Sequence, residues 1–350
     1  MRKGWLAFGT AFLLALSVGA MAACGAGGTG ETGGAGDSQT ELPDRGDQGS
    51  VPGETDDGAI TVGTAEELRA WADRVSEGES FRNATLRLTS DIDLSGELWT
   101  PIDCTSRNLT GFTLDGDGHK ISGMKAEKSL NSTTGEPQNA PDADDVGFFG
   151  RLVNNSITIK DLTFSGASVT GRYSVGVLVG WFQSGSLTLD HVSVTGSTVL
   201  GRKWFGGMIG CVEGGLNSET TATAVSVTDT TVCEAYAYDP DNSGTTIAIR
   251  CGGFVGYTRS MKYSIRDGNF SGNTLTAYHS VGGIFGTVVI DDVGKISISG
   301  TTVSKNTING HSSASYLHEI LNTDNWSYTE RDSFKTGNSV AGNTVQTDAQ

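Results

Sequence analysis

The sequence has little proline, little charge and no basic surplus. Only 6 of its 350 residues are proline, and no Gly-X-Y period is present, which excludes collagen and proline-rich disorder. Charged residues make up 18%, and 40 acidic residues outnumber 24 basic ones, giving a formal net charge of −16. Nucleic-acid binding requires a basic face. We therefore expect no nucleic-acid partner.

Glycine, in contrast, is abundant, with 50 residues. Because glycine is costly inside helices and Ser, Thr and Val favour strands, long helical folds are disfavoured. The composition predicts an all-β protein.

The N-terminus predicts export. Arg2 and Lys3 precede a short apolar run, Trp5–Val18, and small residues follow up to Cys24. The letters MAAC resemble the bacterial lipobox, with Met in place of the usual Leu. Residues 1–23 are therefore predicted to be a lipoprotein signal peptide, with Cys24 lipidated and inserted in the outer face of the cell membrane. Ordinary cleavage, with Cys24 incidental, is the alternative.

Residues 24–58 predict a flexible tether. The segment is rich in glycine and acidic residues and has almost no large apolar side chain, so it cannot bury enough surface to offset the entropy of ordering. A Gly-rich coil of this length reaches roughly 30–35 Å. Such a segment would hold a folded domain away from a membrane, at the cell surface.

A glycine signature recurs five times and defines a repeat. It reads VGFFG, VGVLVG, FGGMIG, CGGFVG and VGGIFG, and ends at Gly150, Gly180, Gly210, Gly256 and Gly286. The steps are 30, 30, 46 and 30 residues. An apolar anchor follows each signature, predicted at Phe164, Val194, Val232, Phe270 and Val303. With these anchors the long step holds two insertions of eight residues, near Glu213–Thr220 and Tyr238–Thr245.

A unit this short cannot bury its own apolar face and must stack on its neighbours. Period-2 alternation within each unit predicts strands, so the fold class is a right-handed parallel β-helix, or solenoid. Residues 59–130 should hold an N-terminal capping helix, begun by Thr64, and the first coils. The five repeats should fill residues 131–311, and a C-terminal cap and tail residues 312–350.

The segments TAEELRAWADRV, LTSDIDLSG, WTPI and FTLDGDGHKISGM, together with the five signatures, resemble bacterial surface proteins with GLUG-type repeats. The resemblance covers about residues 60–311. It implies a parallel β-helix of the pectate-lyase type and a cell-surface setting. Members of that family are mostly described as adhesins or surface modules, so the resemblance carries over no catalytic residues.

One polar column predicted by the anchors raises an enzymatic alternative. Stacking would place Asp161, His191, Asp229 and Asp267 at one corner of successive coils, with carboxylate separations that overlap those of glycosidases. The alternative reading is a solvated corner. We expect no catalytic residues, with a polysaccharide lyase or glycoside hydrolase as the runner-up.

A second column combines cations and aromatic rings in an otherwise acidic chain. It lies before the signature glycines and comprises Arg172, Tyr173, Arg202, Lys203, Trp204, Arg250, Tyr278 and His279. Aromatic faces and basic donors suit sugar rings, carboxylates and sulfates. The column predicts a glycan or host-matrix ligand, with Tyr173, Trp204 and Tyr278 in one stripe. Solvated turn residues are the alternative.

No metal or cofactor motif is present in the sequence. The five histidines lack close pairing, and regular stacking brings none of Cys104, Cys211 and Cys251 together, which leaves Cys233–Cys251 as an open disulfide pairing. The functional expectation is a lipid-anchored adhesin or glycan-binding module. A structural stalk without a ligand remains a third alternative.

Overall fold

The computed structural model describes residues 53–54, 58–128, 144–215, 218–235, 249–259, 262–289, 295–310, 317–322 and 328–347. The predicted signal peptide, Cys24 and nearly all of the predicted tether lie outside these residues. So do two residues of the first segment predicted as an insertion, Leu216 and Asn217, all of the second, Tyr238–Thr245, and residues 312–316, 323–327 and 348–350 of the predicted C-terminal cap and tail.

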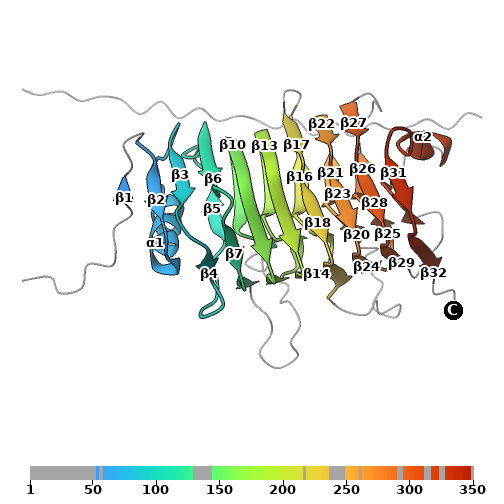
Figure 1. Cartoon of the computed structure of the whole chain (residues 1–350), viewed down its shortest axis with the longest axis horizontal. Helices are drawn as coiled ribbons and strands as arrows, with labels where there is room; N and C mark the ends of the chain where they lie inside the picture. Colours follow the sequence, from blue (N-terminus) through green and yellow to red (C-terminus); the bar gives the residue numbers. More distant parts are fainter. Residues whose placement is uncertain are drawn as a thin grey trace, which may run out of the picture. The chain divides into compact units, whose positions relative to one another are not determined.

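The described chain is a parallel β-helix, as the repeats predicted. Successive coils lie side by side along one axis, and each coil after the first ones contributes strands to three sheets (Figure 1). Every strand pairing between coils is parallel, whereas β1 pairs antiparallel with β2 at the N-terminal end. Each coil therefore satisfies the backbone groups of the next.

The largest sheet has nineteen strands. They are β1 (Gly53–Glu54), β2 (Ile60–Val62), β3 (Thr85–Leu88), β4 (Ile92–Asp93), β5 (Ile102–Cys104), β6 (Phe112–Asp115), β7 (Lys120–Ser122), β10 (Phe149–Ser165), β13 (Val179–Thr195), β16 (Ile209–Glu213), β17 (Glu219–Thr223), β18 (Ser226–Thr228), β21 (Val255–Arg259), β22 (Lys262–Arg266), β23 (Asn269–Ser271), β26 (Phe285–Val289), β27 (Ile296–Ser299), β28 (Thr302–Ser304) and β31 (Ser339–Ala341).

Two smaller sheets complete the coils from β8 onward. The seven-stranded sheet contains β8 (Lys125–Glu127), β11 (Ser168–Thr170), β14 (Thr198–Gly201), β19 (Thr231–Glu234), β24 (Thr274–Ala277), β29 (Thr307–Gly310) and β32 (Thr344–Thr347). The six-stranded sheet contains β9 (Asp144–Val146), β12 (Tyr173–Val175), β15 (Trp204–Gly206), β20 (Arg250–Gly252), β25 (Ser280–Gly282) and β30 (Leu317–His318).

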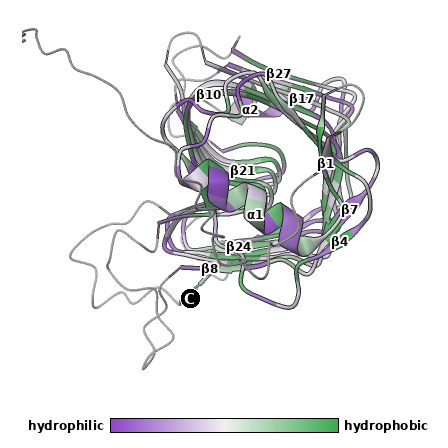
Figure 2. Cartoon of the chain, turned by 90° about the vertical axis from the view of Figure 1, so that its left-hand side faces the viewer, coloured by the Kyte–Doolittle hydropathy of each residue, from purple (hydrophilic) through white to green (hydrophobic). Residues whose placement is uncertain are grey.

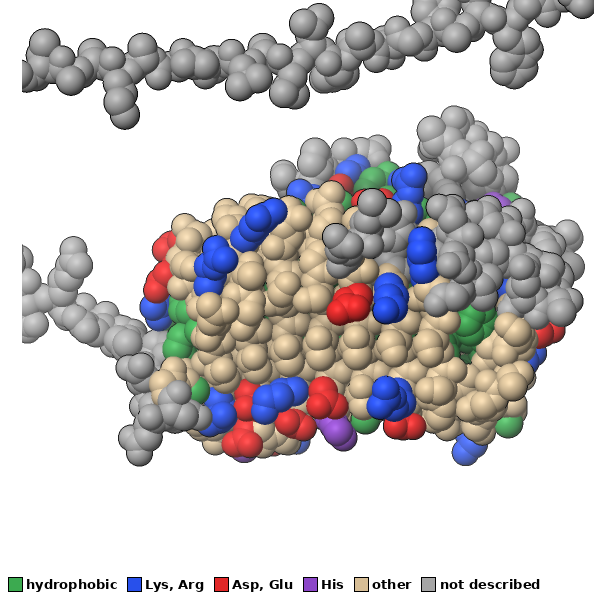
Figure 3. Space-filling model, turned by 90° about the horizontal axis from the view of Figure 1, so that it is seen from above, with side chains coloured by type: hydrophobic (Ala, Val, Ile, Leu, Met, Phe, Trp, Pro, Cys, Tyr) green, Lys and Arg blue, Asp and Glu red, His purple; other side chains and the backbone are tan. Residues whose placement is uncertain are grey.

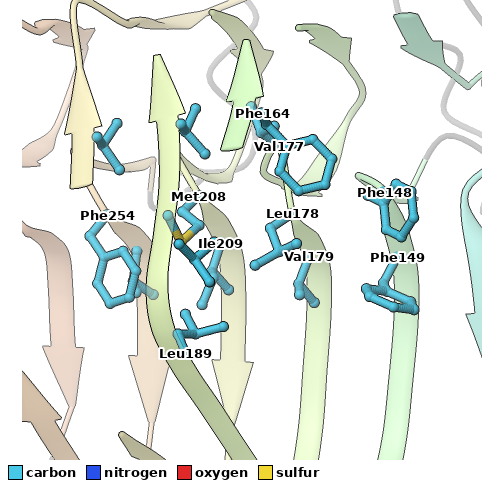
Figure 4. Close-up of a cluster of buried hydrophobic side chains, with 14 of the residues drawn as sticks. Phe148, Phe149, Phe164, Val177, Leu178, Val179, Leu189, Met208, Ile209 and Phe254 are labelled. Atoms are coloured by element: carbon cyan, nitrogen blue, oxygen red, sulfur yellow. The ribbon is translucent and has the colours of Figure 1, made fainter. Parts of the chain in front are cut away.

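Apolar alternation directs one side of each strand inward. In β10, Ile157 and Ile159 are buried and Thr158 between them is half-exposed. The inward side chains of neighbouring coils form a continuous core, which the end-on view shows as apolar residues lining the coils (Figure 2). Figure 4 shows Phe148, Phe149 and other core residues from adjacent strands. Stacking the coils thus buries the apolar faces that one repeat leaves exposed.

The register confirms the signature glycines and corrects the third anchor. The residues before those glycines pair in order, beginning with Phe149 and Val179. However, Val194 pairs with Val227, whereas Val232 pairs with Val199. The third anchor is therefore Val227, and the predicted pair of eight-residue insertions was wrong.

With Val227 as anchor, 17 residues separate it from Gly210, where 14 separate Val194 from Gly180. Then 29 residues lead from Val227 to Gly256, where 16 lead from Val194 to Gly210. The long step thus contains one small insertion and one large insertion.

The predicted N-terminal helix is confirmed as α1 (Ala65–Ser76). The hydroxyl of Thr64 accepts a hydrogen bond from the Glu67 amide, and the Glu67 carboxylate accepts one from the Thr64 amide, which completes a capping box. Trp71 is fully buried and stacks on Phe112 with ring centroids 5.4 Å apart. The helix therefore closes the core at the first coils.

The predicted C-terminal boundary was wrong. Leu317–His318 is strand β30, and the second helix is only the six-residue α2 (Tyr328–Ser333). Beyond it, β31 and β32 pair with β28 and β29 and continue the solenoid past residue 311. This last coil lacks a glycine signature, but it continues a ladder of asparagines: the Asn273 amide donates to the Asn306 side-chain oxygen at 2.9 Å, and the Asn306 amide to that of Asn343 at 3.0 Å.

Candidate functional site

The predicted column of cations and rings lies on the six-stranded sheet and just before its strands. Tyr173 pairs with Asp144, and Trp204 pairs with Arg250. Tyr278 precedes β25 and packs against the core. The predicted residues therefore lie along one side of the solenoid, but Tyr173, Trp204 and Tyr278 do not form one stripe.

Within the column, cationic side chains and aromatic rings contact one another in sequence. At its start, Arg172 makes two hydrogen bonds of 2.9 Å to the carboxylate of Asp144. The guanidinium carbon of Arg172 lies 4.4 Å from the ring centroid of Tyr173. Arg172 is only 9% exposed, and its bond to Asp144 raises its pKa. This arginine is already paired and holds Tyr173 in place.

Lys203 continues the chain between two rings. Its ammonium nitrogen lies 4.9 Å from the ring centroid of Tyr173 and 4.3 Å from that of Trp204. The Trp204 ring in turn stacks on Tyr257, with centroids 4.9 Å apart and planes at 14°. We call Arg172, Tyr173, Lys203, Trp204 and Tyr257 the cation–aromatic stack. Its rings are in contact with one another or with cations.

Two cations of this region face solvent without a carboxylate. In the described residues, no carboxylate oxygen lies within ion-pair distance of the ammonium of Lys203 or the guanidinium of Arg202. Both side chains are half-exposed. Ring faces stabilise an ammonium without neutralising it. Lys203 and Arg202 can therefore meet an incoming anion.

The site has a second side that the sequence patterns did not predict. The residue after each signature glycine lies in one register column: Arg151, Trp181, Cys211, Tyr257 and Thr287. The guanidinium of Arg151 lies 4.7 Å from the Trp181 ring and forms an ion pair with Asp145. The signal that could have revealed this column was its fixed position directly after the signature.

The signature glycines bring these two sides together. A Cβ atom on Gly210 would lie 2.3 Å from the backbone nitrogen of Val175, and one on Gly180 2.6 Å from that of Val146. Real Cβ atoms do not approach backbone so closely. Glycine is therefore required where the backbones of the two sheets meet. A Cβ atom on Gly256 would likewise lie 2.5 Å from the backbone nitrogen of Phe205, and this approach places Trp204 against Tyr257.

Two carboxyl groups of the region have raised pKa values. Burial raises the pKa of Asp145, although its ion pair with Arg151 opposes the shift. Burial also raises the pKa of Glu234 to about 7, opposed by the hydrogen bond from the Tyr278 amide and by the charge of Arg202. The Glu234 oxygen accepts that bond at 3.0 Å. Glu234 is thus a weak competitor for Arg202 in mildly acidic solution.

The remaining predicted positions are less closely joined to the stack. The Arg250 guanidinium donates to the carbonyl of Ile249 at 3.3 Å. The ring of His279 lies 5.2 Å from that of Tyr278. Both side chains are half-buried. Arg250 begins β20 and pairs with Trp204 in the six-stranded sheet, and His279 lies directly before β25.

The carboxylates on which the enzymatic alternative depends are not stacked as predicted. Register aligns Asp161 with His191, then Ala224, then Asp267, so two coils separate the two carboxylates. Asp229 instead aligns with Gly196 and Gly272, at the next corner of the coil. The predicted stacking of Asp229 on Asp267 was wrong, because it rested on the wrong third anchor.

These corner positions share a backbone reason. Asp161, His191 and Asp267 have φ of 50°, 53° and 55°, and Asp229 has 51°. Asp tolerates the left-handed region better than most residues. Their side chains mark sharp bends in the coil, and whether any of them acts in catalysis stays a prediction.

Cys104, Cys211, Cys233 and Cys251 are free thiols, so the open Cys233–Cys251 pairing is not formed. The described residues contain no group of three or more potential metal ligands from His, Cys, Asp and Glu. In the same part of the chain, no helix is long and apolar enough to cross a membrane.

No family model matches the chain. A segment of 117 residues is 33% identical to Halomucin of Haloquadratum walsbyi, and this match covers 30% of the chain but 1% of Halomucin. A solved structure from Bacteroides ovatus, described provisionally as an immunoglobulin A1 protease, aligns with 83% of this chain and 85% of its own, at 17% identity and a TM-score of 0.43. At that level the likeness carries no information on activity.

Proposed function

We propose that the chain is an exported, lipid-anchored β-solenoid that binds acidic glycans at the cation–aromatic stack and so acts as a surface adhesin or matrix-binding module. The observation that carries the proposal is the pair of Lys203 and Arg202. Both are half-exposed cations without a carboxylate partner in the described residues, on a chain of formal net charge −16. An anionic sugar would be attracted by these two cations, whereas the net negative charge of the rest of the protein repels it.

The geometry favours acidic over neutral sugars. Stacking on a neutral sugar needs a free aromatic face, but Lys203 covers one face of Trp204 and Tyr257 stacks on the ring as well. A carboxylate or sulfate needs only the exposed ammonium and guanidinium. A ligand that drew Lys203 away would also uncover part of the Tyr173 and Trp204 rings.

The surface setting rests on sequence. The MAAC motif, the acidic tether and the resemblance to GLUG-type surface proteins support anchoring at Cys24 and display on the outer face of the membrane. The polysaccharide-active enzyme ranks lower, because the carboxylates on which it depended are not adjacent in the solenoid.

The test measures binding of the full chain to polygalacturonate, heparin and neutral dextran. We expect both acidic polymers to bind and dextran not to bind. Lys203→Ala should weaken binding about tenfold, a loss of roughly 1.4 kcal/mol, and added salt should weaken the wild type steeply. Lys262→Ala removes an exposed lysine on β22 and is the matched control. Equal binding by wild type and Lys203→Ala would refute the proposal.

A further inference from the structure

The last coil carries side chains where earlier coils have the glycines of the signature. Register pairs Gly282 with His318, and the same alignment places Glu319 and Asn322 at the positions of the two later signature glycines. A Cβ atom on Gly283 would overlap the carbonyl oxygen of Glu319, because the last coil stacks on that signature. Among the described residues β30 is the last strand of its sheet, so its own coil can carry side chains at these positions.

All three side chains contact residues 328–338, which begin with α2 and which we call the α2 segment. The polar atoms lie 3.2, 2.7 and 2.9 Å apart in the pairs His318–Asp332, Glu319–Lys335 and Asn322–Arg331, which together we call the C-terminal clasp. Phe334 of the same segment packs into the hydrophobic core. On the right of Figure 3, at the C-terminal end, acidic and basic side chains lie together, whereas the middle of the face seen from above is largely uncharged. The clasp therefore holds the α2 segment against the end of the core.

The bonds of His318 require one protonation state of its ring. The side chain is 5% exposed, and its Nδ1 accepts hydrogen bonds from the backbone amides of Ile320 and Leu321 at 3.1 and 3.2 Å. A neutral imidazole has one acceptor nitrogen and one N–H group. Since Nδ1 is the acceptor, the proton lies on Nε2 and is donated to the carboxylate of Asp332. A second proton, on Nδ1, would face two N–H donors and remove the acceptor that serves both amides.

The charges around the ring are mixed. Burial lowers the pKa of His318, the bond to Asp332 opposes this shift, and the positive charges of Arg331 and Lys335 lower the pKa further. Glu319 is the second carboxylate of the clasp, and Lys335 lies within ion-pair distance of both carboxylates. The neighbouring strands β25 and β29 carry no ionisable side chain. The net effect of these groups is to keep the ring neutral while the clasp is closed.

We propose that the C-terminal clasp is an acid-sensitive switch, in which protonation of His318 releases the α2 segment and uncovers the end of the core beside β30. A released histidine takes up a proton below a pH of about 6.5, whereas the ring in the closed clasp does not. Opening therefore becomes more favourable as the pH falls below this value, and the clasp stays closed above it. The strands β31 and β32 keep their own pairing with β28 and β29.

The two carboxylates of the clasp act in the same direction, but only at lower pH. The bond from Lys335 lowers the pKa of Asp332 below its ordinary value of 3.8. Burial raises the pKa of Glu319, but the bonds from Lys335 and Asn343 outweigh it and bring the pKa below the ordinary 4.5. Their contribution to closure is lost only as the pH falls below these values. A measurement at pH 5 thus reports mainly on His318.

The test is hydrogen–deuterium exchange, read by mass spectrometry, on the full chain carrying Cys24→Ser to prevent lipidation. Labelling at pH 7.5 and pH 5.0 is scaled for the intrinsic pH dependence of exchange. An ordinary histidine pKa of about 6.5 allows the opening constant to rise by up to about 30-fold between these values, and we expect the α2 segment to exchange at least about fivefold faster at pH 5.0. Exchange of β31 and β32 should change little. The readout must be local because Glu234 changes global stability in the opposite direction.

His318→Asn keeps a side-chain oxygen that can accept from the two amides but cannot take up a proton, so the faster exchange at pH 5.0 should disappear. His191→Asn, at an exposed histidine whose φ of 53° asparagine tolerates, is the matched control and should behave as wild type. His318→Gly restores the signature residue and should leave the α2 segment exposed at both pH values, which gives a second variant if asparagine disturbs the clasp.

Equal protection of the wild-type α2 segment at both pH values would overturn the proposal. So would a His318→Asn protein that keeps the wild-type pH dependence, or a His318→Gly protein as well protected as wild type at pH 7.5.

Discussion

Trp204 stacks on Tyr257 from the next coil, with ring centroids 4.9 Å apart and planes at 14°. Trp204 lies before one glycine signature and Tyr257 directly after the following one. The pair therefore joins two sheets and two repeats at once. It links the packing of the coils to the position of Lys203, whose ammonium lies 4.3 Å from the Trp204 ring.

This stack should contribute measurably to stability. Aromatic pairs add about 0.5–1.5 kcal/mol beyond their area. In a double-mutant cycle with Trp204→Leu and Tyr257→Leu, we expect a coupling free energy of about 1 kcal/mol, measured by chemical denaturation. Trp204→Leu with Phe182→Leu, which changes a fully buried core residue, serves as the control cycle. Additive effects in the first cycle would show that the rings do not stabilise each other.

The glycine signatures give a sharper stability prediction. Gly210→Ala would place a methyl group 2.3 Å from the backbone nitrogen of Val175, where neither strand can move without breaking sheet pairing. We expect a loss of about 3 kcal/mol or more in unfolding free energy. Gly96→Ala is the control, since nothing lies within 4 Å of a Cβ atom there. A Gly210→Ala protein as stable as Gly96→Ala would contradict the close approach.

Much of the fold could be predicted from the sequence because the glycine spacing, the apolar alternation and the capping residues all indicated the same architecture. The glycine spacing indicated the repeat, and the alternation around Ile157 and Ile159 indicated strands with one buried side. The Thr64 and Glu67 capping box located the helix at the N-terminal end, and the structure confirms all three.

The third anchor could not be predicted, because each coil contains two similar segments. Val194 and Val199 lie five residues apart, on either side of a sharp corner, and both point inward. In the third repeat, Val227 and Val232 repeat this pattern. An insertion beside such a pair leaves the local pattern unchanged, so only pairing with the next coil shows which valine is equivalent.

Only part of the site could be predicted, because periodicity aligns residues within one sheet but does not show which residues of another sheet contact them. Periodicity brought Tyr173 and Trp204 to one side of the solenoid, and the structure confirms that they are neighbours, with ring centroids 6.4 Å apart. It could not show that Tyr257 crosses from the other sheet, because that contact depends on how sharply the chain bends at the glycines. Tyr278 was misplaced because it lies eight residues before its signature glycine, whereas Tyr173 lies seven and Trp204 six before theirs, so the three do not share one register column.

The membrane anchor is tested separately from the solenoid. If Cys24 is lipidated, labelled fatty acid should enter the wild-type protein, and Cys24→Ala should move the protein from the membrane fraction into the medium. Cys233→Ala removes a different free thiol and should leave both results unchanged. Equal membrane retention of wild type and Cys24→Ala would contradict the lipidated N-terminus.

Glu234 should make stability fall as pH rises. Its pKa is about 7 in the folded protein, raised by burial from an ordinary value of 4.5. Between these two pH values the unfolded chain is ionised while the folded one holds its proton, so stability decreases through this window and levels off above pH 7. The total loss is on the order of 3 kcal/mol, from a pKa difference of about 2.5 at 1.36 kcal/mol for each pKa unit.

Glu234→Gln removes this ionisation but keeps an oxygen that can accept the bond from the Tyr278 amide. We therefore expect the variant to match wild type at pH 4 and to be more stable at pH 8, as measured by urea denaturation. Because the charge of Arg202 lowers the pKa of Glu234, Arg202→Ala should shift the wild-type decline to higher pH. Acidic glycans should likewise bind Glu234→Gln better than wild type above pH 7, since no carboxylate then competes for Arg202. A Glu234→Gln protein that follows the wild-type stability curve at both pH values would show that this carboxyl group is not the source of the dependence.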